Sequence, residues 1–166
     1  MYSCYTMGMD QITNAFLCRR CSAVPADQMA VFKPTDDRLV AYPELKLLHI
    51  HFGVSTHTDE LSIAEAKFHW QWLEQVTQPY PNIQWFFITD FTRKDDSEFV
   101  VDEAKAIYTK IRHHPKLAAG AICGPTYAMK MFINVLFFFG GTQTVVVDTL
   151  AQAEEHYQKW WNKKPH

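Results

Sequence analysis

The chain has 166 residues, which is the size of about one domain. Hydrophobic residues make up 48% of it and aromatic residues 14%, enough for one packed core and too many for a disordered chain. Sixteen basic residues against eighteen acidic residues give a formal charge of −2, so the composition lacks the positive charge that favours nucleic-acid binding. These numbers predict a compact, near-neutral domain with no nucleic-acid partner.

The first thirty residues differ from the rest of the chain. They carry a loose polar pattern and lack the basic region and continuous apolar run of a secretory signal peptide. We therefore predict a loosely structured N-terminal extension over residues 1–30 and a single domain over residues 31–166. The expected location is the cytoplasm, with reduced thiols.

Two short edge strands are predicted at Met29–Lys33 and Arg38–Tyr42. The turn Pro34–Asp37 separates them. A clearer strand covers Leu45–Val54, where apolar residues alternate with their neighbours. Leu48, Ile50, Phe52 and Val54 fall on one face of this strand, and Leu47, His49 and His51 fall on the other.

Helices and apolar strands alternate from here on. Thr58 or Asp59 is expected to cap a helix of about 18 residues, and a second helix is expected from about Ser97 to Arg112. The inward stripe of the first helix is predicted to contain Leu61, Ala64, Phe68, Trp72 and Val76. Buried strands are predicted at Ile83–Thr89, Leu117–Cys123 and Thr144–Val147, a third helix at Thr126–Phe139, and a last helix capped by Thr149 and Gln152.

The segment Met131–Val147 contains no charged residue, so a membrane span is one reading of it. The other is a buried helix followed by a buried strand, and we favour it because Gly140 and Gly141 interrupt the apolar run. We expect no membrane span.

This alternation predicts an α/β fold with a mixed, mostly parallel sheet of four to six strands. The strands at 83–89, 117–123 and 144–147 are expected to lie parallel and adjacent, since one helix separates each from the next. The two leading strands are expected to form an antiparallel edge.

Two motifs contain residue types that bind metals. Cys18 and Cys21 have the spacing of a dithiol or of half a zinc site, but no second C-x-x-C exists, so we interpret them as incidental thiols, with metal or redox use as the alternative. His49 and His51 share one strand face, and His57 is the nearest further histidine. We interpret the pair as half-exposed histidines on an edge strand. No metal and no cofactor are expected.

The junction after the strand at 83–89 is the candidate regulatory site. Asp90 ends the strand, Thr92 lies in the loop, and Asp96 and Ser97 are expected to open the next helix. Functional residues of open α/β sheets lie beyond the carboxyl ends of the strands, and a helix N-terminus favours a phosphate. Ser97 is either a plain helix cap or a phosphorylation site. No nucleophile is paired with a base, so no enzymatic activity is expected.

Residues 45–161 resemble the STAS family, the sulfate-transporter and anti-sigma-factor-antagonist domain, in its SpoIIAA-like branch. The similarity rests on the apolar strand ending at Asp90 with the loop to Asp96 and Ser97, on the segment Leu117–Phe139, and on the ending VVVDTLAQAEEHYQKWW.

The resemblance implies a STAS-like, non-enzymatic regulatory module that binds a protein partner such as an anti-sigma kinase. In the family, the serine or threonine at this helix start is phosphorylated. Here that residue is Ser97, and because Glu98 follows it with a negative charge, we expect Ser97 to act as a cap.

The alternative function is small-ligand or lipid binding in an apolar pocket beneath the third helix, lined by Phe132, Leu136 and Phe139. The same helix is apolar on every side, and Trp70, Trp160 and Trp161 add aromatic surface nearby. Since large apolar surfaces usually mark interfaces, a homodimer or a stable partner complex is expected.

Overall fold

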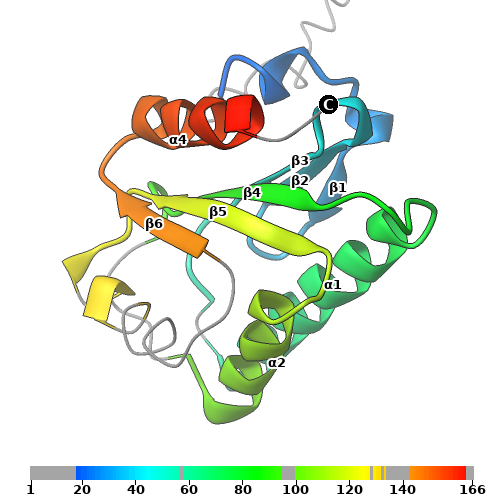
Figure 1. The fold of residues 1–166 in the computed structure, drawn as a ribbon. Coiled ribbons are helices and arrows are strands. Elements are labelled where there is room, and N and C mark those ends of the chain that lie inside the picture. The colour runs from blue at the N-terminus through cyan, green and yellow to red at the C-terminus, as the bar shows by residue number, and fades with distance from the viewer. Residues whose placement is uncertain are drawn as a thin grey trace, which may run out of the picture.

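The structure is a computed structural model and describes residues 18–56, 58–94, 100–127, 129–131, 133 and 143–163. Its centre is one six-stranded sheet whose spatial order follows the chain order (Figure 1). The strands are β1 (Ala30–Phe32), β2 (Asp37–Tyr42), β3 (Leu47–His51), β4 (Trp85–Asp90), β5 (Leu117–Cys123) and β6 (Gln143–Val147). β1, β2 and β3 pair antiparallel, and β3 to β6 pair parallel. The predicted α/β class, the antiparallel edge and the parallel trio are confirmed.

Helices cover both faces of the sheet. α1 (Asp59–Thr77) follows β3, α2 (Asp102–Arg112) follows β4, and α4 (Leu150–Lys163) follows β6. Right-handed crossovers between successive neighbouring strands bring their helices to the same face. Accordingly, α1 and α2 lie on one face and α4 lies on the other (Figure 1). After β5, residues 127, 129–131 and 133 are helical. Within the described residues, no helix combines the length and the hydrophobicity needed to cross a bilayer.

The face opposite α1 and α2 has two covers. α4 covers one part with Ala153 and Tyr157, and the Tyr157 hydroxyl donates to the carbonyl oxygen of Leu45 at 2.7 Å. Residues 18–29 cover β2 and β3, with Cys21 and Met29 fully or almost fully buried. A salt bridge of 3.1 Å between Arg20 and Glu154 joins the two covers.

The buried face of α1 differs from the predicted stripe. Ala64 is exposed, whereas Glu65 and His69 are buried. Hydrophobic periodicity misplaces the face because it assigns polar residues to solvent, and here both polar side chains have buried partners. The inward residues are Ser62, Glu65, Ala66, His69, Trp72, Leu73 and Thr77.

The start of α2 also differs from the prediction. The helix begins at Asp102 and not near Ser97. Val100 and Val101, which precede it, are not helical, and the backbone of Val101 is extended. Asp102 and Glu103 then supply the negative charge that the helix N-terminus favours. The N-cap position of α2 is Val101. Asp96 and Ser97 themselves lie outside the described residues.

A buried carboxylate joins three parts of the fold. Asp37 is fully buried, and its Oδ1 accepts hydrogen bonds from the Thr35 hydroxyl and the Gly53 amide, each at 2.8 Å. Its Oδ2 lies 2.8 Å from Nε2 of His69. The Gly53 backbone packs so closely that a Cβ there would lie 1.7 Å from the Thr35 carbonyl oxygen. Asp37 thus fastens the β1–β2 turn to the end of β3 and to α1.

Asp37→Ala is expected to lower the free energy of unfolding by about 3–5 kcal/mol, because it leaves buried polar partners without an acceptor. Urea denaturation measures the loss. Asp27→Ala, at an exposed position near the sheet edge, is the control and should change stability by less than about 0.5 kcal/mol. Equal losses in both variants would contradict the role of Asp37.

The same carboxylate predicts an acid-sensitive step. Burial by itself raises the pKa of Asp37, but the hydrogen bonds with His69 and the Gly53 amide outweigh it, and the pKa lies below its ordinary range. A carboxyl whose pKa is lower in the folded state than in the unfolded state, where it is about 4, stabilises the fold at any pH above the unfolded-state pKa. This stabilisation is lost as the pH falls through the folded-state pKa. The difference in unfolding free energy between wild type and Asp37→Ala should therefore shrink below about pH 4. A difference that stays constant down to acid unfolding would contradict this.

Candidate functional site

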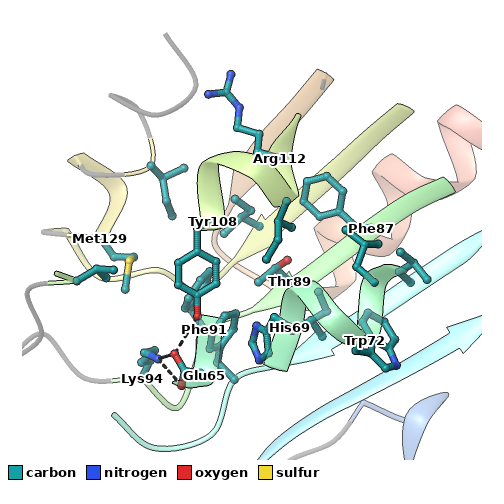
Figure 2. A pocket seen from close by; sticks show the side chains of 18 of the residues that line it. Glu65, His69, Trp72, Phe87, Thr89, Phe91, Lys94, Tyr108, Arg112 and Met129 are labelled. Carbon is teal, nitrogen blue, oxygen red and sulfur yellow. Dashed lines mark hydrogen bonds and ion pairs between the residues drawn. The ribbon is translucent and has the colours of Figure 1, made fainter. Parts of the chain in front are cut away.

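A cavity of about 130 Å³ lies between the sheet and the layer formed by α1 and α2 (Figure 2). Its lining is mostly apolar because β3, β4 and β5 each present alternate residues to this face. From the sheet come Leu48, Ile50, Phe87, Thr89 and Ile122, and from the helices come Trp72, Leu73, Tyr108 and Ile111. Met129 and Ile133 close it from the segment after β5.

One end of the cavity is polar. Lys94 donates two hydrogen bonds to the carboxylate of Glu65, at 2.7 and 2.9 Å, and the Tyr108 hydroxyl donates a third at 3.0 Å. Figure 2 shows this cluster beside His69 and Phe91. The Lys94 ammonium also lies 4.6 Å from the centre of the Phe52 ring, within cation–π range. Residues from α1, from α2 and from the loop after β4 therefore hold one buried ion pair at the cavity wall.

The ion pair at this end of the cavity is shielded from solvent, and this shifts the pKa of Glu65. Burial, and next the negative charge of Asp37, raise the pKa of Glu65 above its ordinary range, while the Lys94 charge opposes the shift. Glu65 and Lys94 are 2% and 6% exposed. A paired buried carboxylate with a perturbed pKa is more frequent at functional sites than elsewhere.

Gly120 determines how closely the ring of Phe87, a lining residue of the cavity, can approach β5. Phe87 and Gly120 are direct neighbours on β4 and β5. The Phe87 ring lies so close to Gly120 that a Cβ at this position would be 2.3 Å from its Cζ. The ring therefore lies flat on the strand.

The sequence prediction of a pocket beneath the third helix concerns this face. Met129 and Ile133 from that segment line the cavity. Phe132, Leu136 and Phe139 lie outside the described residues and remain predicted lining residues.

Asp90 and Thr92 of the predicted regulatory site lie close together but not at the cavity. Oδ1 of Asp90 accepts hydrogen bonds from the Thr92 amide at 3.0 Å and from its hydroxyl at 2.7 Å. Oδ2 of Asp90 lies 2.9 Å from Nδ1 of His51. Asp90 thus orients a histidine on the face opposite the cavity.

That histidine belongs to a second cluster, which the sequence analysis did not assemble. Cys18, Cys21, His49 and His51 each place one potential ligand atom within 4.8 Å of the others. The interpretation of the histidines as half-exposed on an edge strand is wrong, since both are fully buried and β3 is an inner strand. Their rings stack with centroids 4.2 Å apart.

The two thiols of this cluster are inequivalent. The hydrogen bond with Cys21 lowers the pKa of the Cys18 thiol far below its usual range, with a further contribution from His49. The same hydrogen bond, followed by burial, raises the pKa of Cys21. The two sulfurs therefore differ in their surroundings, although both lie beside Nδ1 of His49.

A joint reading of the two motifs is the signal that could have found this cluster. The C-x-x-C pair and the H-x-H pair are each incomplete as a metal site, and together they supply four ligands. The sequence matches no protein-family model and no curated protein, so the functional assignment depends on the geometry of these two sites.

The contribution of the Glu65–Lys94 pair to the free energy of unfolding can be tested by substitution. Glu65→Leu should lower the free energy of unfolding by about 3–5 kcal/mol, because it removes the carboxylate that accepts two hydrogen bonds from the buried Lys94 ammonium. Adding Lys94→Met should recover most of that loss in urea denaturation, since neither charge of the pair then remains.

The exposed pair Lys67–Glu103, which joins α1 to α2, is the control. Glu103→Ala should cost at most about 1 kcal/mol. If the losses of Glu65→Leu and Lys94→Met simply add in the double variant, the two side chains do not act as a pair.

Proposed function

We propose that the protein is a non-catalytic binding module that takes up one small, mainly apolar molecule in the cavity between the sheet and α1 and α2. This is the ligand-binding alternative of the two functions expected from the sequence. The observation that carries it is an apolar cavity of about 130 Å³ with one polar end.

The cavity volume supports a ligand of limited size. An apolar cavity of roughly 150 Å³ accommodates one benzene ring, so the space suits a single ring or a short acyl chain. Ligand sites typically combine an apolar lining with a few placed polar groups. Here Glu65, Lys94 and Tyr108 are those groups, and they would orient a polar end of the ligand.

The rigid surroundings support binding without a large rearrangement. Phe52 stacks on Phe91 with ring centroids 4.4 Å apart, and His69 meets the Phe52 ring edge-on at 4.8 Å. Because Asp37 fixes His69 in turn, the polar end is already organised before a ligand arrives.

Indole and hexanoate serve as probes of this function, one for a ring and one for a short acyl chain. We expect at least one of them to bind the wild-type chain. Met129→Trp fills the cavity and should weaken that binding by about tenfold or more, which is about 1.4 kcal/mol. Isothermal titration calorimetry gives the affinities.

Met131→Trp is the matched control, because Met131 lies two residues away on the same segment and is 57% exposed. It should leave the affinity unchanged. The proposal fails if neither probe binds the folded wild-type chain, or if the two tryptophan variants weaken binding equally.

The regulatory function implied by the STAS resemblance is the second candidate. Tyr127 and Met131 support it, since they are 79% and 57% exposed and offer apolar surface to a protein partner or a second copy. Part of the aromatic surface expected at such an interface is used within the chain, because Trp160 and Trp161 pack against the core beneath α4. A switch at Asp96 and Ser97 remains a prediction.

A further inference from the structure

The cysteine–histidine cluster on the α4 side of the sheet has the composition of a metal site. Cys18 and Cys21 come from the segment that covers β2 and β3, and His49 and His51 come from β3 itself. Thiolate and imidazole ligands favour Zn²⁺ over Mg²⁺ or Ca²⁺, which prefer oxygen. The cysteine spacing is also that of zinc sites.

The distances between ligand atoms fit a tetrahedral ion. Nδ1 of His49 lies 3.5 Å from Sγ of Cys18 and 3.3 Å from Sγ of Cys21. With Zn–S bonds of about 2.3 Å and Zn–N bonds of about 2.0–2.1 Å, a tetrahedron places sulfur and nitrogen about 3.5 Å apart. The cluster is therefore close to the arrangement that the ion requires.

The surroundings orient the ligands as in known zinc sites. Nδ1 of His51 lies 2.9 Å from the Asp90 carboxylate, and Asp90 is itself fixed by two hydrogen bonds from Thr92. A carboxylate on one ring nitrogen keeps the proton there and leaves the other nitrogen as the ligand. The amide of Cys21 points to Sγ of Cys18 at 3.3 Å and favours its thiolate.

His49 gives an independent indication. It is fully buried, both sulfurs face its Nδ1, and its Nε2 has no hydrogen-bond partner among the described residues. A fully buried imidazole whose hydrogen bonds among the described residues go to two thiols alone is costly as a plain core residue. As a metal ligand it gains a strong bond at Nδ1.

We propose that Cys18, Cys21, His49 and His51 bind one Zn²⁺ ion in a closed, structural site. Four protein ligands leave no open position for a substrate, and two thiolates neutralise the ion. The ion would fasten residues 18–29 to β3, next to the Arg20–Glu154 salt bridge that fastens the same segment to α4. The proposal takes up the alternative of metal use that the cysteine spacing left open.

The test is metal analysis of the full chain, purified under reducing conditions and then freed of loosely held ions. We expect about one zinc per chain. Replacement by Co²⁺ should give the visible bands of a tetrahedral site and a thiolate-to-cobalt charge-transfer band. Chelation of the metal should speed proteolysis at residues 18–29 while β4 and β5 stay protected.

Cys21→Ser and His51→Gln should lose the zinc and the cobalt spectrum. Cys123→Ala, which removes a buried cysteine outside the cluster, and His113→Gln, which removes an exposed histidine, are the controls and should retain both. If the ligand variants fail to fold, the wild-type cobalt spectrum decides. The proposal is overturned if reduced, folded wild-type chain holds no tight zinc after Zn²⁺ is added, or if the control variants lose the metal as well.

Discussion

The handedness of the parallel crossovers is the constraint from which the rest of the architecture follows. Because each parallel strand is added beside the previous one, the connections after β3 and β4 return over the same face, which holds α1 and α2. The opposite face of the sheet is covered by the segments at the two ends of the described chain. α4 supplies it over β4 and β5, and residues 18–29 supply it over β2 and β3.

This arrangement gives the two faces different contents. On one face, the sheet and helices leave an apolar cavity, with a buried ion pair at its end. On the other, a short segment with little hydrophobic surface lies over two histidines. β3 contributes to both, since Ile50 faces the cavity and His49 and His51 face the cysteines. Strand alternation alone separates the two sites.

Much of the fold could be predicted from the sequence, and the exceptions share a cause. The strands at 85–90 and 117–123 are mainly apolar and buried, and their order followed directly from that pattern. The strand at 143–147 was predicted to be buried, but it lies at the sheet edge and is only half-buried. The face of α1 did not follow from the pattern, because Glu65 and His69 are buried through partners at Lys94 and Asp37 that are distant in sequence. Periodicity registers hydrophobicity, and it carries no information on such long-range pairs.

The candidate sites were predicted less well for a related reason. A pocket beneath the third helix was expected from the apolar pattern of that helix, but a cavity lined by α1 and α2 was not. Its polar end was not expected either, since Glu65, Lys94 and Tyr108 come from three separate segments. The histidines and cysteines were each judged alone as incomplete sets. Whether two half-sites meet depends on where residues 18–29 pack, which no local pattern determines.

Gly120 has a consequence for how the cavity can diversify. It does not line the cavity, yet the flat position of the Phe87 ring exists only because this residue has no side chain. Any larger residue there would tilt the ring away from the strand and into the space above it. For the proposed binding function, a change at this one buried position would alter the size of molecule that the cavity accommodates, while every lining residue stays the same.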